Sequence, residues 1–177
     1  MKSSLQALLL AGAAAAENAT APSYLTATAI VTNAQNNSAL QCWRFSDALQ
    51  APTTPGIIGA QRFGLDVASG AELAVIPPRF DGQVHNAPVP AFVSFASGLA
   101  HLSLPHGADE AWILGGENGL IVAVDTTGSG HRTRFPSDET TISLFLPFLD
   151  ARVPPHEVLS EGPCFYHRSQ IVGGGEA

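Results

Sequence analysis

The sequence predicts an all-β domain built from many short strands. Segments rich in apolar and β-branched residues follow one another at short spacing, and Gly, Pro, Asp or Asn separates nearly all of them. Charged residues make up only 13% of the 177-residue chain, which carries 17 Gly and 13 Pro, a composition that favours strands and turns. Helical evidence is thin, and Pro154-Pro155 breaks any long helix in the late segment 150–160.

The N-terminal residues 1–16 have the pattern of a secretory signal peptide. Lys2 provides a positive start, Leu5 to Ala16 form an apolar core, and Ala14-Ala15-Ala16 offers a cleavage site of small residues. The apolar run is too short to span a membrane. We therefore expect the secretory pathway or the extracellular space, with an Ala-rich helix of a cytosolic protein as the alternative.

Residues 17–40 are expected to form an N-terminal segment that precedes the domain. Two sequons predict N-glycosylation at Asn18 and Asn36. Residues 24–31 carry enough β-branched side chains for an edge strand.

The compact domain is expected to cover residues 41–164. The chain has only two cysteines, Cys42 and Cys164, and in an oxidising compartment they should pair and join its two ends. Residues 165–177, which end in a run of glycines, are expected to form a flexible tail. The predicted strands within the domain are 57–65, 72–76, 91–96, 99–104, 111–114, 120–124, 131–135 and 141–146.

Two histidine-containing segments, 77–88 and 125–136, lie about one short barrel apart. They resemble the two sequence motifs of the cupin superfamily, a small antiparallel β-barrel that usually holds a metal. The resemblance implies a single cupin-like (jelly-roll) antiparallel β-barrel, with one disulfide here, in which His85 and His131 face the interior. Ala87 stands where the family has a second histidine, and neither Ala91 nor Phe92 can replace its glutamate.

Only two of the four ligands of the family remain, so we expect no metal and no cofactor. His101 lies on a nearby predicted strand and is the alternative third ligand, which would give a metal-dependent isomerase or oxygenase with an incomplete site. Strand alternation places His101 with Leu99 and Ser103 on one face, and His131 with Thr133 and Phe135 on one face.

Other chemistries find little support. The chain has no Gly-x-Ser-x-Gly motif, and the glycine-rich segment 115–119 contains no Lys and reads as a turn. Its formal net charge is −7 with only 8 Lys and Arg, so nucleic acid is not an expected partner. Asp125 ends an apolar strand and either caps the following turn, which we favour, or orients a histidine.

A closer resemblance covers nearly the whole mature domain. Several segments resemble a group of small secreted fungal proteins with a cupin-like barrel, among them the hetero-Diels–Alderases of tropolone–sesquiterpenoid pathways. The family resemblance implies a cofactor-free pericyclase that joins a quinone methide to an apolar terpenoid olefin. The matching segments are 77–80, 85–88, 95–101, 110–113, 119–126, 130–133, 153–156 and 161–164.

On this reading His85, His101 and His131 are the catalytic candidates, which polarise or dehydrate the substrate. The expected partner is a small apolar organic substrate, without nucleic acid or membrane, and a homodimer stays open because cupin barrels often pair. The alternative is a secreted binding protein without catalysis. The expected substrate-binding residues are Trp43, Arg79, Phe92, Trp112 and Phe145.

Overall fold

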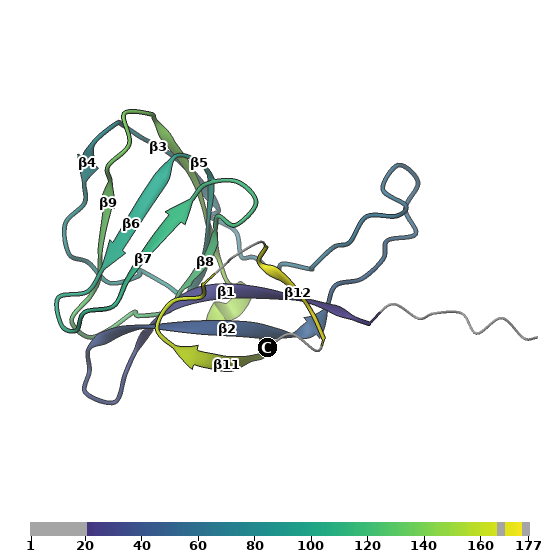
Figure 1. Cartoon of the computed structure of the whole chain (residues 1–177), viewed down its shortest axis with the longest axis horizontal. Coiled ribbons are helices and arrows are strands. Elements are labelled where there is room, and N and C mark those ends of the chain that lie inside the picture. The colour runs from purple at the N-terminus through teal and green to yellow at the C-terminus, as the bar shows by residue number, and fades with distance from the viewer. Residues whose placement is uncertain (1–20, 166–168, 175–177) are drawn as a thin grey trace, which may run out of the picture.

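The computed structural model describes residues 21–165 and 169–174, whose strands form two sheets (Figure 1). Within these ranges the helical content is one 3₁₀ turn, Leu149–Ala151, so the predicted all-β class is confirmed. The predicted signal peptide, residues 1–16, and the first sequon at Asn18 lie outside the described residues. No helix in the described part is long and apolar enough to cross a membrane.

The larger sheet has eight strands in the order β11-β2-β1-β8-β5-β10-β3, and β12 pairs with β1 outside this path. Its pairings are antiparallel except for the parallel pair of β1 and β8. The strands are β1 (Ser23–Thr32), β2 (Ser38–Ala48), β3 (Glu72–Ile76), β5 (Ala91–Ser97), β8 (Leu120–Ala123), β10 (Thr141–Pro147), β11 (His156–Glu161) and β12 (Ile171–Gly173).

The smaller sheet has four antiparallel strands in the order β4-β9-β6-β7. It faces the larger sheet, and the space between the two holds the main core (Figure 1). The strands are β4 (Phe80–Asp81), β6 (Leu99–Ser103), β7 (Glu110–Leu114) and β9 (Arg132–Phe135).

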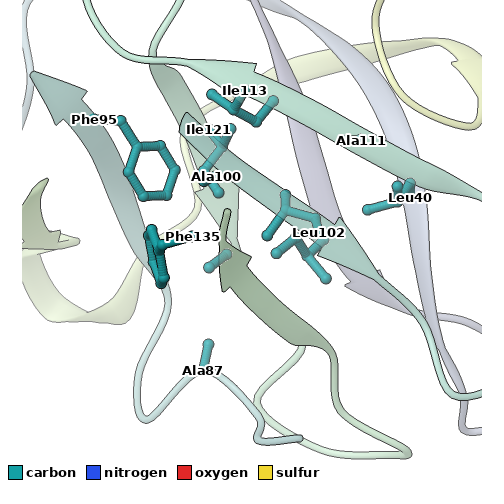
Figure 2. Close-up of a cluster of buried hydrophobic side chains, with 11 residues drawn as sticks. Leu40, Ala87, Phe95, Ala100, Leu102, Ala111, Ile113, Ile121 and Phe135 are labelled. Atoms are coloured by element: carbon teal, nitrogen blue, oxygen red, sulfur yellow. The ribbon is translucent and has the colours of Figure 1, made fainter. Parts of the chain in front are cut away.

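Alternation along the strands directs one side of each sheet into the main core. Figure 2 shows this cluster of buried side chains, with contributions from both sheets. The larger sheet supplies Ile30, Leu40, Phe95, Ile121 and Ala123, the smaller sheet supplies Ala100, Leu102, Ala111, Ile113 and Phe135, and Ala87 comes from a connecting loop.

The outer face of the larger sheet carries a second apolar cluster. Its central side chains are Phe45 and Phe92, both 0% exposed, and Phe63 from a loop packs against Phe45 at a ring distance of 5.1 Å. The central strands of the larger sheet, β1, β2, β5 and β8, are therefore covered on both faces, which matches their high apolar content.

Strand β1 corrects the expectation of an edge strand at residues 24–31. It lies inside the larger sheet between β2 and β8, and five consecutive residues of it, 26–30, are buried. The compact domain therefore begins near residue 23 and not at 41. Its neighbour β8 comes from a segment some ninety positions further along, so local sequence carries no sign of this pairing.

Residues 169–174, part of the segment expected to be flexible, are ordered in the structure. Strand β12 pairs with the start of β1, and Gln170 is only 2% exposed. The side-chain amide of Gln170 donates to the carbonyl oxygens of Thr26 (2.9 Å) and Leu120 (2.7 Å) and accepts from the backbone N–H of Leu120 (3.1 Å). This residue thus links β1 to β8.

The predicted strand at 57–65 is wrong. The segment from 49 to 71 runs out from the sheets through turns, and its only β-pairings are two isolated bridges, Gln50 to Arg62 and Val67 to Phe148. Gly56 and Gly59 have φ of 93° and 91°, which interrupt an extended strand. Ile58, which suggested a strand, is 74% exposed.

The predicted disulfide between Cys42 and Cys164 is confirmed. It joins β2 to the segment after β11 across 122 positions of sequence. A disulfide of this kind persists in an oxidising compartment, so the bond agrees with passage through the secretory pathway.

Candidate functional site

A cavity of about 430 Å³ lies between the two sheets, next to the main core. Its wall is mainly apolar, with polar groups from a few side chains. The lining residues are Ile30, Glu72, Ile76, Phe80, Gly82, His85, Ala87, Pro88, Val93, Phe95, Leu102, Ile121, Ala123, His131, Thr133, Phe135, Ser143 and Phe145.

His85 and His131 lie side by side in this wall. Their backbones form an antiparallel bridge in which each N–H donates to the other carbonyl oxygen, at 2.9 and 2.8 Å. As a result the two imidazole rings lie next to each other, with their centroids 4.6 Å apart and their planes tilted by 54°. Segments 46 positions apart are thus joined at the site by their main chains and not only by side-chain packing.

Gly130 makes the close approach of these two segments sterically feasible. Its φ is 73°, and a Cβ there would lie 2.7 Å from the carbonyl oxygen of His85. A residue with a side chain would be strained at this φ and would also push the His85 backbone away.

Asp125 holds the ring of His131 from inside the protein. Asp125 is 0% exposed, and its Oδ2 accepts hydrogen bonds from Nδ1 of His131 (2.8 Å) and Oγ of Ser38 (2.7 Å). Its Oδ1 has no partner among the described residues. The side-chain amide of Asn86 donates to the backbone carbonyl of Asp125 at 2.9 Å, which fixes the turn that carries the carboxylate. Asp125 therefore orients the histidine, the alternative that the sequence favoured less.

These contacts leave Nε2 as the reactive position of both rings. Nδ1 of His131 donates to Asp125 and Nδ1 of His85 donates to the carbonyl of Gln83 at 2.9 Å, while neither Nε2 has a protein partner in the described structure. A neutral ring with its proton on Nδ1 accepts a hydrogen bond at Nε2, and a protonated ring donates one there. The pair can take a proton from a bound hydroxyl group and return it.

His131 and His85 differ in their exposure. His131 is 5% exposed, whereas His85 belongs to the exposed residues at the rim of the cavity. Glu72 and Phe80 are also exposed lining residues, so this side forms the opening. The buried His131, held by a carboxylate, is the better placed group to act on a molecule inside the cavity.

Aromatic rings form much of the remaining wall. Phe135 packs between Phe80 and Phe95, with both ring distances at 6.2 Å. Phe145, on β10, lines the cavity as expected from the sequence. The other predicted residues that line it are His85 and His131.

His101 does not lie in the cavity, which corrects its assignment as a catalytic candidate. Its neighbours Ala100 and Leu102 point into the core, so alternation turns His101 to the outer face of the smaller sheet. There its Nε2 bonds to Oε2 of Glu110 at 2.9 Å, and its ring stacks on Trp112 at 4.0 Å. The hydrogen bond from His101, aided by one from Trp112, lowers the pKa of Glu110 below its ordinary value of 4.5.

Four predicted substrate-binding residues are also misplaced. Trp112 is 55% exposed on the outer face of the smaller sheet. Trp43 and Phe92 belong to the cluster on the outer face of the larger sheet, where Trp43 stacks on His156 at 3.6 Å. Alternation explains Phe92, because it places Val93 and Phe95 in the cavity instead. Arg79 is 73% exposed and pairs with Asp138 on the surface.

Several residues of the site were not predicted from the sequence. Phe80, Phe95 and Glu72 line the cavity, and Ser38 supports Asp125. The alternation of residues 91–97 shows that Phe92 and Phe95 lie on opposite faces of the strand. Which of the two faces the cavity is decided by the packing of the smaller sheet. Ser38 belongs to the second sequon, whose Asn36 is exposed in the turn between β1 and β2.

Among the described residues, no group of three or more His, Cys, Asp or Glu side chains is arranged to hold a metal ion. His85 and His131 supply two nitrogen donors at the cavity, and Asp125 is engaged with Ser38 and His131. His101, the third ligand of the metal-dependent alternative, faces away from them.

No protein-family model matches this chain, and no curated protein is similar to it at a significant level.

Proposed function

We propose that the cavity between the sheets binds a small apolar molecule that carries a hydroxyl group, and that His131 promotes its reaction by proton transfer. The observation that carries this proposal is the Asp125–His131 pair, a buried carboxylate that orients an imidazole at the wall of an apolar cavity. A base held by a third group in this way is a recurrent arrangement in acid–base and nucleophilic catalysis.

The size and chemistry of the cavity support a small organic substrate. Its volume of about 430 Å³ falls within the range of roughly 300–1,000 Å³ that small-molecule sites occupy. Phenylalanine rings and aliphatic side chains form most of the wall, and the histidine pair supplies the convergent polar groups. Such a site favours a ligand with one polar end and an apolar body.

The reaction class that we propose is a cyclisation without a cofactor, of the hetero-Diels–Alder type suggested by the sequence resemblance. A cycloaddition redistributes electron pairs within the two partners, forms two new bonds and releases nothing. The protein then needs to hold the partners in one orientation, which can contribute on the order of 7–11 kcal/mol when the geometry is good. The apolar wall would also keep water from a reactive quinone methide.

His131 would act before the cycloaddition. A phenol with a neighbouring hydroxymethyl group forms a quinone methide when the phenolic proton is removed and the benzylic hydroxyl leaves as water. Nε2 of the neutral His131 can accept the phenolic proton, and the protonated ring can return it to the departing hydroxyl. His85, 4.6 Å away at the opening, would bind the departing hydroxyl or its water.

The site is proposed to work in a secreted protein. Support comes from the disulfide, which is stable in oxidising compartments, and from the signal-like pattern of the first sixteen residues. The exposed Asn36 in a tight turn is suitably placed for a glycan.

The proposal is tested with hydroxybenzyl alcohol, as quinone-methide precursor, and humulene, as apolar olefin. We expect the wild-type protein to form the cyclic adduct, and His131→Ala to lower the rate by about 10²-fold or more, the usual contribution of a general acid–base group. The control is His106→Ala, because His106 is an exposed loop residue outside the cavity. It should keep the wild-type rate.

Binding without turnover is the second function that the same cavity allows. Naphthol and naphthalene distinguish the two steps, since they share an apolar body and differ in one hydroxyl group. A binding protein without catalysis would bind naphthol more tightly than naphthalene, would lose this preference in His131→Phe, and would form no adduct from any precursor. Equal binding of both probes to wild type and variant would refute the role of His131 altogether.

A further inference from the structure

Strand β7 leaves one side of its backbone unpaired. It is the last strand of the smaller sheet and pairs only with β6 in the described structure. Just beyond its end, the N–H of Gly115 donates to the carbonyl of Gly98 at 2.9 Å. In an antiparallel ladder the residues that bond to the neighbour alternate with residues that face away from it.

That alternation determines which groups lie on the free side. Counting back from Gly115 by twos, Ile113 and Ala111 bond to β6, and the N–H and C=O groups of Glu110, Trp112 and Leu114 point outward. The stack of His101 on Trp112 agrees, because pairs without hydrogen bonds bring their side chains closest. Three residues at two-residue spacing thus present donors and acceptors to solvent.

A groove of about 570 Å³ runs along this free edge. All five residues of β7 line it, and Pro163 to Phe165 form the opposite wall. The opposite wall is fixed, because Cys164 is bonded to Cys42 and its N–H donates to Oγ1 of Thr28 at 3.0 Å. Both sides of the groove are therefore held in place before any ligand arrives, which lowers the entropic cost of binding.

Large apolar side chains line the groove and its rim. Trp112 is 55%, Leu114 69% and Phe165 79% exposed. Proteins normally protect an exposed strand edge with charges, proline or a bulge, whereas β7 offers a single charged residue, Glu110. The indole of Trp112 is oriented in advance by its stack on His101 and by a hydrogen bond from Nε1 to Glu110 at 3.3 Å.

Charge indicates what the groove binds. Among the described residues that line it, Glu110 is the charged one and none is Lys or Arg. The exposed Asp109 and Glu117 flank β7 in the sequence. We propose that the free edge of β7 binds an extended peptide segment that carries a basic residue and alternating apolar side chains, as a fifth strand of the smaller sheet. An extended backbone matches edge groups at two-residue spacing, and the acidic surroundings favour a basic segment over a second copy of this chain, whose formal net charge is −7.

The test uses a blocked seven-residue peptide that alternates valine with threonine and carries one central lysine, added to the full chain. We expect slower hydrogen exchange of the backbone amides of Glu110, Trp112 and Leu114 on binding, and a change in Trp112 fluorescence. The same peptide with every amide nitrogen methylated keeps its side chains but cannot donate to β7. It should bind about tenfold more weakly or not at all.

Protein variants separate the groove from a general effect of exposed apolar residues. Trp112→Ala and Leu114→Ala should each weaken binding, Trp112→Ala by about tenfold as expected for an aromatic anchor. The matched control is Val75→Ala, since Val75 is 65% exposed on the edge strand β3. This variant should bind the peptide like wild type.

Three results would overturn the proposal. They are unprotected amides of β7 at millimolar peptide, equal affinity for the methylated peptide, and protection of these amides by self-association of the chain, which would assign the edge to a second copy. The binding of naphthol in the cavity between the sheets is measured in the same samples. The two proposals can therefore fail independently.

Discussion

Asp125 and His131 are the residues on which the proposed chemistry depends. A carboxylate with no exposed surface is costly to bury unless it is hydrogen-bonded, and here both observed bonds converge on one oxygen. These two hydrogen bonds offset part of the cost and fix the ring of His131, whose Nε2 has no protein partner in the described structure. The sequence identified both residues as candidates, but it did not predict that they contact each other. That contact depends on the conformation of the turn between them, residues 126–130.

We expect Asp125→Asn to separate positioning from binding. The asparagine oxygen can still accept from Ser38 and from Nδ1 of His131, but the negative charge that stabilises a protonated imidazole is lost. The turnover rate should fall by about 10²-fold or more. The affinity for naphthol should change by less than about threefold, which corresponds to a fraction of the free energy of one hydrogen bond. Steady-state kinetics with parallel binding measurements decide this, and an unchanged rate would remove Asp125 from the mechanism.

Gly130→Ala should disturb the histidine pair through the backbone. The new Cβ would lie 2.7 Å from the carbonyl oxygen of His85, at a φ of 73°. We expect the free energy of unfolding to fall by about 1–3 kcal/mol and naphthol binding to weaken. The matched control is Gly107→Ala, where φ is 98° but no atom lies within 4 Å. If both variants lose the same stability and keep naphthol binding, the close approach of His85 and His131 is not what requires glycine.

Among the elements, β1 and β12 show how distant segments complete the larger sheet. β1 pairs with β2, β8 and β12, which come from three separate parts of the chain. Gln170, next to β12, fills the place between β1 and β8 with three side-chain hydrogen bonds. The end of the described chain is therefore part of the fold.

Gln170→Ala tests this role of the C-terminal segment. It removes two side-chain donors from the carbonyl groups of Thr26 and Leu120 and one acceptor from the N–H of Leu120, within the buried or partly buried interior of the sheet. We expect the free energy of unfolding to fall by about 2–4 kcal/mol, at about 0.5–1.5 kcal/mol for each hydrogen bond. Urea denaturation measures this free energy. A loss below about 0.5 kcal/mol would mean that the hydrogen bonds of Gln170 do not stabilise the sheet.

Strand positions were largely predictable, and strand partners were not. The predicted strands from 72–76 to 141–146 coincide with observed ones apart from one or two residues at their ends, because alternation and turn residues are local signals. The wrong strand at 57–65 had the apolar residues of a strand, but the glycines within it produced turns. The inner face of β5 was misjudged at Phe92, since Phe92 and Phe95 are both large and apolar and only the opposing sheet distinguishes them.

For the whole molecule, the disulfide closes the fold from β2 to the end of β11. Removal of Cys42–Cys164 by a double replacement with alanine should lower the free energy of unfolding by about 2–5 kcal/mol, because the unfolded chain then loses a long closed loop. The variant should still bind naphthol, since neither cysteine lines that cavity. Peptide binding along β7 should weaken, because the disulfide holds the wall around Cys164. Denaturation curves and both binding assays check this, and a loss of naphthol binding by a folded variant would contradict it.

The two sheets enclose a mainly apolar cavity to which His85 and His131 contribute polar groups. The free edge of β7 is a separate site on the smaller sheet. Composition and turn spacing predicted an all-β domain, whereas the placement of His85 and His131 in its interior was implied by the cupin resemblance. The wrong assignments of His101, Trp43 and Trp112 have one cause: a strand has two faces, and an aromatic or imidazole ring is compatible with both. Only the packing of one sheet on the other distinguishes the cavity from the outer surfaces.

The most direct test of the account is a titration of the ¹⁵N-labelled histidines with naphthol and with naphthalene, followed by NMR of the imidazole nitrogens. We predict that naphthol shifts Nε2 of His131 and His85, that naphthalene leaves both nearly unchanged, and that His101 responds to neither. Shifts at His101, or no difference between the two probes at His131, would contradict a hydroxyl-binding site in the cavity between the sheets.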